Sequence, residues 1–373
     1  MRALTALLPA VLALSACTGS NPVGSVSPSA QISPAQTSPA SDFPLSTVDF
    51  TCRLPVVTFS QAGADSTYAG GFITFPTAQY RADPNGVIRL RVGPGDLATD
   101  AAPVLYGSNQ TGTPTYDLAR RRWLPVGSGQ EAPDGSSYAY SVPGATGADP
   151  TSVHVVTIAT GADRVVSINP PPSGAAVGWA LADFDGTHAY LVGQQIDQFP
   201  GGLWRLDTLT GAVNQLSQAR GVLLVRGGNA WTGVVNPADP SPPHPGKGQG
   251  FDSIVQVDLT TGAQTTWIYR PGSMVYLVGV DQGGHPVVSV APGPDFDVSH
   301  RPLLVLDRPQ DSGTLVSTAG QNLLLMQPDV DRIWFGNEHG IYLWTPTRGL
   351  LKVFGFQGDA SLSQWTAPAG RCV

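Results

Sequence analysis

One glutamate and one histidine, adjacent in the sequence, are the side chains best suited to catalysis. The chain has only two glutamates, and Glu338 directly precedes His339 in a predicted turn. A histidine can act as a general base because its pKa lies near neutral pH. We therefore name Glu338 and His339 as the candidates for catalysis. The alternative interpretation is a polar hairpin turn.

The remaining polar residues form no metal-binding or nucleophilic motif. None of the six histidines is spaced as in His-x-x-x-His, and no Gly-x-Ser-x-Gly motif is present. Short acidic clusters at Asp295–Asp297 and Asp329–Asp331 could help to hold Ca²⁺. Their carboxylates are few, and we interpret them as turns. We therefore predict no metal and no cofactor, with Ca²⁺ as the alternative that these clusters leave open.

The N-terminus has the pattern of a secretory signal. Met1-Arg2 is followed by an apolar run from Ala3 to Leu14, which is too short for a membrane-spanning helix. The sequence Leu-Ser-Ala-Cys at residues 14–17 resembles the lipobox of bacterial lipoproteins. This resemblance implies cleavage before Cys17 and a diacylglycerol on its sulfur. The alternative is an ordinary signal peptide with a cysteine near its cleavage site.

The segment after Cys17 predicts a tether. Residues 18 to about 45 are rich in Ser, Pro, Ala, Gln and Thr, and they have too few large apolar side chains to fold. We therefore expect a signal peptide at 1–16, a disordered tether at 17–45 and a folded domain at 46–373. The domain would lie outside the cytoplasmic membrane, at its outer face or in the periplasm, held to the membrane by the lipidated N-terminus.

Two further cysteines bracket the predicted domain. Cys52 lies near its start and Cys372 is the penultimate residue. An exported domain permits a disulfide between them. Closing so long a loop would stabilise the fold by at most about 5 kcal/mol in the chain-entropy model. The alternative is two unpaired thiols.

The composition predicts an all-β protein. Charged residues are 13% of the chain, whereas Gly and Pro, which break helices, number 44 and 34. The net charge is −7 and no basic stripe is visible. Nucleic-acid binding is therefore not expected.

A repeated pattern predicts how the strands are organised. A short apolar strand, Thr-Gly and a second strand recur around Gly161, Gly211 and Gly262, with spacings of 50 and 51 residues. A looser copy at Gly313 adds another 51. Repeats of this length, built from strands and turns, indicate a propeller or a solenoid. A single four-stranded sheet cannot bury both faces, but sheets packed in a ring can.

The repeats can be extended into five four-stranded units between about residues 133 and 355. Residues 48–126 diverge, and we interpret them as one further blade, with a strand at 116–124 and an insertion between about 93 and 112. The tail at 362–366 would complete this blade, and a Cys52–Cys372 bond would lock it. We therefore predict a six-bladed propeller, or a seven-bladed one if the first region forms two blades.

The units resemble blades of bacterial WD40-like and TolB-like β-propellers. Residues 331–344 also resemble the repeat of two-component-regulator and streptogramin-lyase propellers. This resemblance implies a propeller fold. In the lyases it implies a histidine and carboxylates around the funnel, to which only Glu338 and His339 can be matched.

These observations predict a lipid-anchored, extracytoplasmic binding or scaffold module without catalytic activity, whose protein or small-molecule ligand the sequence does not identify. The alternatives are a lyase or hydrolase with its site in the funnel mouth, and a soluble partner of envelope machinery. Convergence of His, Asp or Glu from several inner strands would favour the enzyme. A funnel lined by Gly, Ala and aromatic residues would favour the binding module.

Overall fold

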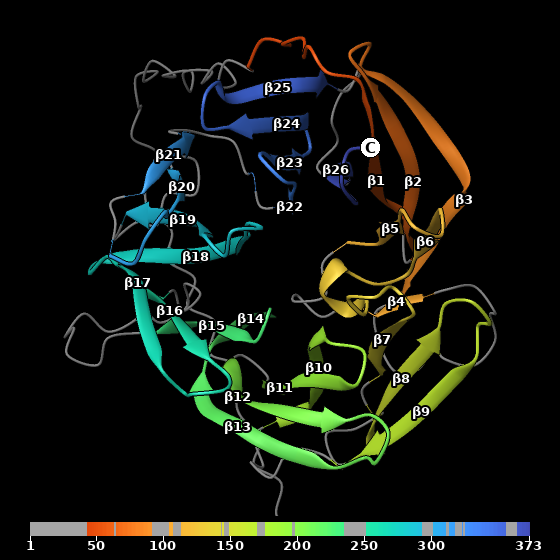
Figure 1. Ribbon diagram of the computed structural model, residues 1–373, viewed down its shortest axis with the longest axis vertical. Coiled ribbons are helices and arrows are strands. Elements are labelled where there is room, and N and C mark those ends of the chain that lie inside the picture. Colours follow the sequence, from red (N-terminus) through yellow and green to blue (C-terminus); the bar gives the residue numbers. More distant parts are fainter. Residues whose placement is uncertain are drawn as a thin grey trace, which may run out of the picture. The chain divides into compact units, whose positions relative to one another are not determined.

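The protein is an all-β, six-bladed propeller (Figure 1). The computed structural model describes residues 43–373 except 63–64, 92–103, 107–112, 143, 145–148, 170–175, 196–197, 235–250, 293–300, 311–312, 318–322, 324 and 356–363. Cys17, the predicted signal peptide, the predicted insertion and Asp295–Asp297 fall wholly or mostly outside these residues, so the expectations about them remain predictions.

Four of the six blades are regular four-stranded antiparallel sheets, each with its first strand innermost. Blade 3 contains β10 (Ala176–Phe184), β11 (His188–Gln195), β12 (Gln198–Asp207) and β13 (Val213–Arg220). Blade 4 contains β14 (Val222–Arg226), β15 (Asn229–Val234), β16 (Ser253–Asp258) and β17 (Gln264–Tyr269). Blade 5 contains β18 (Ser273–Val280), β19 (Pro286–Pro292), β20 (Leu303–Val305) and β21 (Thr314–Ser317). Blade 6 contains β22 (Leu325–Pro328), β23 (Ile333–Asn337), β24 (Gly340–Thr345) and β25 (Gly349–Gly355).

The other two blades depart from this pattern. Blade 2 has three strands, β7 (Ser137–Val142), β8 (Thr151–Thr157) and β9 (Asp163–Ile168), and Glu131 occupies the inner position through an isolated bridge to Tyr138. Blade 1 has the order β26 (Gln364–Pro368), β1 (Cys52–Ala62), β2 (Asp65–Phe75), β3 (Gln79–Arg91), with the short β4 (Val104–Tyr106) at its edge.

Residues 116–124 do not form the single strand that we predicted. They form most of a hairpin of β5 (Thr115–Asp117) and β6 (Arg122–Leu124), followed by the 3₁₀ turn η2 (Ser128–Gln130). The reversal at Arg121, whose φ is 53°, breaks the strand. A non-glycine residue is uncommon in this left-handed region. The sequence therefore offers no sign of the turn, because the glycine that usually marks one is absent.

The Thr-Gly turns lie where the repeat predicted them, between the third and fourth strands of their blades. Gly161, Gly211, Gly262 and Gly313 have φ values of 70°, 76°, 72° and 78°. Glycine has no Cβ and adopts this conformation without steric cost. The Asp207 carboxylate stabilises one such turn by accepting hydrogen bonds from the backbone N–H groups of Leu209 and Thr210 at 2.8 and 2.9 Å.

The hydrophobic core is divided among the seams between neighbouring blades. One cluster joins blades 2 and 3, and others join blades 3 and 4, 4 and 5, 5 and 6, and 6 and 1. The bulkiest fully buried side chains are Trp231, Trp334 and Tyr342. Between blades 1 and 2 the β5–β6 hairpin intervenes, and it packs on blade 1 through one cluster and on blade 2 through another. Apolar contacts therefore close the ring on every side, as a propeller requires.

The two ends of the chain meet in blade 1, as predicted. β26 pairs antiparallel with β1, from Val56 opposite Pro368 to Ser60 opposite Gln364. Cys52 and Cys372 form the expected disulfide, with Cα atoms 5.5 Å apart.

The segment before blade 1 already contacts the ring. Phe43 packs edge-on against Tyr342, and the Ser46 N–H donates to the Lys352 carbonyl at 2.8 Å. These contacts start three residues before the predicted domain start at 46. Within the residues that the structure describes, no helix has the length and apolar character needed to cross a membrane.

Candidate ligand-binding mouth of the propeller

The innermost strands of the blades place polar residues at one end of the ring. Because the blades repeat the same strand order around an axis, their inner strands run in the same direction and end on the same face. The inner strand or inner segment of each blade carries a charged or amide side chain within three residues of its end. These side chains are Glu131, Asp183, Arg226, Gln282, Gln327 and Arg371.

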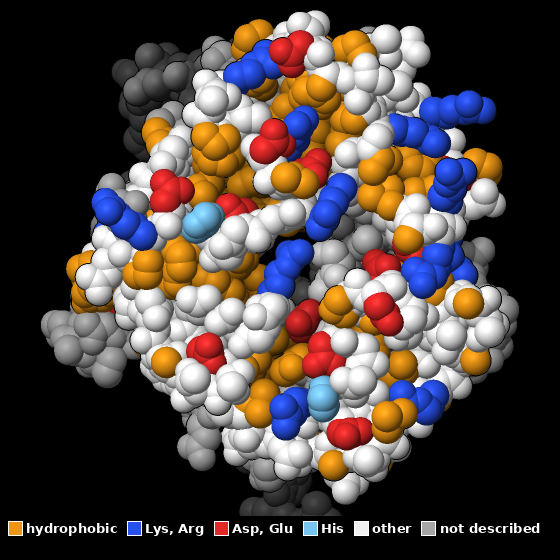
Figure 2. Space-filling model, in the orientation of Figure 1, with side chains coloured by type: hydrophobic (Ala, Val, Ile, Leu, Met, Phe, Trp, Pro, Cys, Tyr) orange, Lys and Arg blue, Asp and Glu red, His pale blue; other side chains and the backbone are white. Residues whose placement is uncertain are grey.

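Five of these six side chains line one cavity of about 430 Å³, which we call the mouth. It is completed by the β5–β6 turn, with Asp117 and Arg120, and by Asp134 in the turn before β7. Asp183 lies next to the mouth. Gly129 follows the lining residue Ser128, and a β-carbon added to Gly129 would be 3.2 Å from the Asp183 Oδ1 atom. Figure 2 shows charged side chains of both signs around a hollow at the centre of the face that it draws.

Two arginines in the mouth differ in how they are held. The Gln282 side-chain oxygen, in the amide orientation that satisfies its neighbours, accepts hydrogen bonds from Nη2 and Nε of Arg371 at 2.9 and 3.1 Å. The guanidinium of Arg226 is accessible to solvent and makes no hydrogen bond or ion pair with a residue in the described part of the chain. Surrounding protein atoms nevertheless desolvate it and lower its pKa, and Arg371 lowers it further, whereas Asp183 and Asp281 act in the opposite direction.

Two carboxyl groups at this end of the ring have pKa values near neutrality. Burial raises the pKa of Glu131 to about 7, and the charge of Asp117 adds to this effect while Arg120 opposes it. Burial likewise raises the pKa of Asp183 to about 7, although the backbone N–H of Phe184 and the charge of Arg226 oppose the rise. Both groups can therefore gain or lose a proton close to pH 7.

Asp117 is already engaged within its own turn. Its Oδ2 atom lies 3.3 Å from Nη1 of Arg120, and its Oδ1 atom accepts hydrogen bonds from the backbone N–H groups of Ala119 and Arg120 at 2.9 and 3.2 Å. The carboxylate is buried. Asp117 and Arg120 thus form a local pair that fixes the β5–β6 turn at the edge of the mouth.

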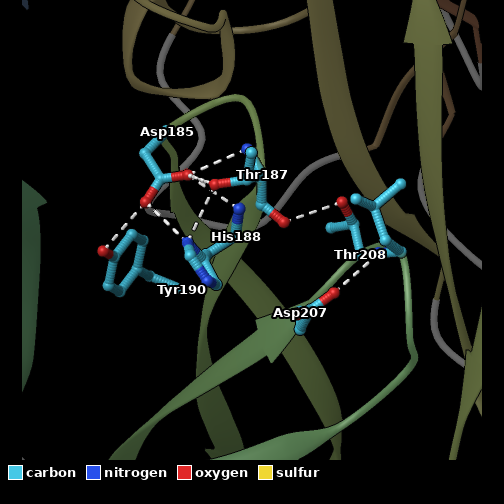
Figure 3. Close-up of polar contacts among 7 residues, drawn as sticks. Asp185, Thr187, His188, Tyr190, Asp207 and Thr208 are labelled. Carbon is cyan, nitrogen blue, oxygen red and sulfur yellow. Dashed lines mark hydrogen bonds and ion pairs between the residues drawn. The ribbon is translucent and has the colours of Figure 1, made fainter.

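A network of side chains holds the turn that follows Asp183 (Figure 3). The Oδ1 atom of Asp185 accepts hydrogen bonds from the backbone N–H groups of Thr187 and His188 at 2.9 and 2.7 Å. Its Oδ2 atom lies 3.1 Å from both His188 Nδ1 and the Tyr190 hydroxyl, which donates to it. Burial and the Asp185 charge raise the pKa of Tyr190 to about 12.

The neighbouring turn of the same blade is tied to this network. Thr208 donates from its hydroxyl and from its backbone N–H to the Thr187 carbonyl, at 2.8 and 3.0 Å. Blade 5 repeats the aspartate–histidine pair, because Asp281 accepts from the His285 N–H at 2.8 Å and lies 3.0 Å from its Nδ1 atom. These pairs make the turns around the mouth rigid.

Glu338 and His339 lie in the turn between β23 and β24. This turn joins the second and third strands of blade 6, so it is on the face opposite the mouth. The Glu338 Oε1 and His339 Nε2 atoms are 3.6 Å apart, and Asn337 Oδ1 accepts a hydrogen bond from the His339 N–H at 2.8 Å. The structure does not bring the pair together with the mouth residues, and its role in catalysis stays a prediction.

The Asp329–Asp331 cluster forms local contacts. Asp329 Oδ2 accepts from the Trp334 indole N–H at 3.3 Å, and Asp331 pairs with Arg332 at 2.7 Å. No group of three or more His, Cys, Asp or Glu side chains suited to a metal ion occurs among the described residues.

The sequence did not reveal the mouth residues as a set. Glu131 could have been noticed as one of only two glutamates. Arg226 and Asp281 precede glycine-containing turns, so aligning the blade units at the ends of their inner strands would have placed polar residues in one column. Arg371 stands beside Cys372, and only the predicted closure of the ring could have suggested its position.

Comparison with known proteins identifies no family for this chain. Neither a protein-family model nor a curated protein sequence matches this chain. Similar solved structures include a prolyl endopeptidase with 13% identity and a TM-score of 0.46, matched over 80% of this chain and 49% of that one. Others are an oligogalacturonate lyase in complex with manganese, with 11% identity, a TM-score of 0.44 and 82% of each chain covered, and the tricorn protease, with 12% identity, a TM-score of 0.40 and coverage of 82% and 26%. The chain therefore spans about half of the prolyl endopeptidase and about a quarter of the tricorn protease.

Proposed function

We propose that the protein is a non-catalytic binding module whose ligand occupies the mouth. The observation that carries this proposal is the convergence of polar side chains from several blades and from the C-terminal tail on one cavity of about 430 Å³. A cavity of this size suits a small molecule. Its lining residues stand at the ends of strands and in hydrogen-bonded turns, so they are held in place before a ligand arrives.

The acidic residues in the mouth bear on the choice between binding and catalysis. The mouth is not lined by Gly, Ala and aromatic residues alone, as the simplest binding module would be. However, the lining carboxylate of Asp117 is occupied by Arg120, and the carboxylate of Asp281, which precedes the lining residue Gln282, is occupied by His285. Arg226 and Arg371 instead present donors to the cavity, which is the arrangement of a recognition site.

A pair of tryptophan substitutions tests where the ligand binds. Ser128 is exposed and lines the mouth, whereas Val165 is exposed on β9 away from it. The whole chain and its Ser128→Trp and Val165→Trp variants are screened for small molecules that raise the melting temperature, since a ligand of the native state must stabilise it. We expect the shift to persist in Val165→Trp and to disappear in Ser128→Trp. Equal shifts in both variants would place the site elsewhere.

A hydrolase or lyase with its site in the mouth is the second candidate function. Glu131 and Asp183, whose pKa values are raised to about 7, favour it because a group that titrates near the working pH can serve as a general acid or base. Incubating the whole chain with oligosaccharide and peptide mixtures, followed by mass spectrometry, would detect cleavage. Loss of turnover in Glu131→Gln but not in Glu338→Gln would assign the chemistry to the mouth. The reverse result would assign it to the β23–β24 turn.

We also propose that the module is held at the outer face of a membrane by a lipid on Cys17. The support is the signal-like N-terminus and the Leu-Ser-Ala-Cys sequence at residues 14–17. Two or more acyl chains would hold it stably, at about 0.8 kcal/mol per buried CH₂ group. Mass spectrometry of the mature N-terminal peptide tests the proposal. An unmodified Cys17, or a Cys17→Ser variant that stays with the membrane fraction, would refute it.

A further inference from the structure

We propose that the mouth recognises its ligand through a carboxylate group held between the guanidinium groups of Arg226 and Arg371. This inference rests on the proposed binding function and specifies the class of ligand: a small, hydroxylated monocarboxylate. The two arginines come from the end of β14 and from the C-terminal tail, and both line the mouth.

Arg371 is held in position from several sides. The next residue, Cys372, is joined to Cys52 and donates its N–H to Asp329 Oδ2 at 3.4 Å. The N–H of Val373 donates to the Arg53 carbonyl at 3.2 Å. Gln282 accepts from Nε and one terminal nitrogen of Arg371, which leaves the other terminal nitrogen without a partner among the described residues. An arginine fixed along one edge loses little conformational freedom when its remaining donors bind a carboxylate.

Arg226 has the complementary property of being unoccupied. It makes no hydrogen bond or ion pair with a described residue, although Arg371, Asp183 and Asp281 are close enough to influence it electrostatically. The Asp281 carboxylate is engaged by the N–H and the ring of His285. Asp183 is half-buried, and its pKa of about 7 leaves it partly protonated at neutral pH. The repulsion between the two arginines is therefore only partly offset, and an anion between them would relieve it.

The rest of the mouth favours a single negative charge. The arginines lining it are Arg120, Arg226 and Arg371, and the acidic residues are Asp117, Glu131 and Asp134, so the formal charges balance. A phosphate dianion would gain from Arg226 and Arg371 but would be repelled by the carboxylates that line the mouth. A monocarboxylate carries less charge to repel. Its hydroxyl groups can also bond to the Gln327 amide and to Glu131, which accepts when ionised and donates when protonated.

Matched ligand pairs test this assignment on the whole chain. Calorimetric titrations use sodium gluconate, glycerate and lactate. Each is compared with the alcohol in which CH₂OH replaces the carboxylate, namely glucitol, glycerol and propane-1,2-diol. Inorganic phosphate and sulfate are titrated as competing anions. We expect at least one carboxylate to bind and its alcohol not to bind. Arg226→Gln and Arg371→Gln should each weaken binding by about 10- to 100-fold, the loss expected of a charge-assisted hydrogen bond. Arg348→Gln, an exposed arginine of the β24–β25 turn, is the matched control and should leave the affinity unchanged.

The outcomes separate failure of this inference from failure of the binding function. Tighter binding of phosphate or sulfate, or equal binding of a carboxylate and its alcohol, would overturn the carboxylate assignment while leaving a ligand in the mouth. Unchanged affinity in both arginine variants would overturn the role of the two arginines. If no carboxylate binds, but a neutral compound binds and Ser128→Trp abolishes its binding, the mouth binds a ligand of another class. If no compound binds in a way that Ser128→Trp blocks, both proposals fail.

Discussion

The seams between the blades and the mouth are built from the same inner strands, yet they have opposite chemistry. In the seams, the inner strands present apolar side chains such as Leu181, Val225 and Val280, which are buried. At their ends, one or two residues further on, the same strands present arginines, carboxylates and amides. The difference separates stability from binding along a single strand. Substitutions in the seams should unfold the ring, whereas substitutions in the mouth should leave it folded and change what it binds or how it responds to pH.

The largest effect should come from the disulfide, because it lies in the closing seam and also adjoins a mouth residue. Replacing both Cys52 and Cys372 by Ser removes a cross-link between residues 320 positions apart. We expect the free energy of unfolding to fall by up to about 5 kcal/mol, and carboxylate affinity to fall with it because Arg371 loses an anchor. Urea denaturation followed by tryptophan fluorescence measures the first effect and calorimetry the second. Cys17→Ser is the control, and a double variant as stable as the native chain would contradict the prediction.

A seam residue that does not line the mouth should change stability alone. Trp334 is fully buried and stacks on Phe75 with ring centroids 5.5 Å apart, joining blade 6 to blade 1. We expect Trp334→Ala to cost about 3–5 kcal/mol and Trp334→Phe clearly less, because phenylalanine keeps part of the aromatic contact. Ligand affinity of the folded protein should not change. A weaker ligand affinity in Trp334→Phe would show that seam and mouth are energetically coupled.

A mouth carboxyl should have a smaller effect on stability, of the opposite sign and dependent on pH. Glu131 has a pKa of about 7 in the folded state and about 4.3 when unfolded, so between these values the folded protein holds a proton that the unfolded chain has lost. Stability therefore falls as pH rises through this window. Glu131→Gln lacks the buried charge, and we expect it to be more stable than the native chain at pH 8, by about 1–2 kcal/mol after allowance for solvent screening.

The comparison at pH 4 provides the control for Glu131. There the native carboxyl is largely protonated in the folded state, so the variant and the native chain should have nearly equal stability. Denaturation curves at pH 4, 6 and 8 measure the trend. Glu338→Gln, which changes the other glutamate, tests whether the loss of any carboxylate has the same result. An advantage of Glu131→Gln that does not vary with pH would exclude titration as its cause.

The smallest effect should appear at a turn residue that does not itself line the mouth. Arg121 occupies a left-handed position, with φ of 53°, in the β5–β6 turn, and this conformation favours glycine. We expect Arg121→Gly to stabilise the protein by about 0.5–1 kcal/mol. The converse substitution, Gly161→Ala, meets no atom within 4 Å, so its cost should be backbone strain of about 1 kcal/mol. Equal stability of both variants and the native chain would show that these turns tolerate either residue.

Features with local causes were predictable from the sequence. The turn glycines were identified because a tight reversal requires positive φ at one residue, and their spacing of 50 and 51 residues revealed the blades. Closure of the ring followed from a short C-terminal strand and a pair of cysteines at the two ends of the domain. The β5–β6 hairpin was mistaken for a strand because Arg121 carries no such local signature.

The candidate site was not predictable in the same way, because it arises from convergence. Glu131, Arg226 and Arg371 are separated by 95 and 145 residues, and each resembles an ordinary polar residue next to a turn. Only the parallel arrangement of inner strands around an axis brings them to one cavity. The pair that local adjacency does reveal, Glu338 and His339, lies at the other end of the blades.

Blade 1 combines strands from both ends of the folded region, and this determines which chains can close the ring. Its innermost strand, β26, follows all the other described strands along the chain, and it pairs with β1, which precedes them. A chain that stops before residue 364 lacks the whole of β26 together with Arg371 and Cys372. Only a chain that extends through β26 and Cys372 can therefore both close the ring and carry the full set of mouth residues.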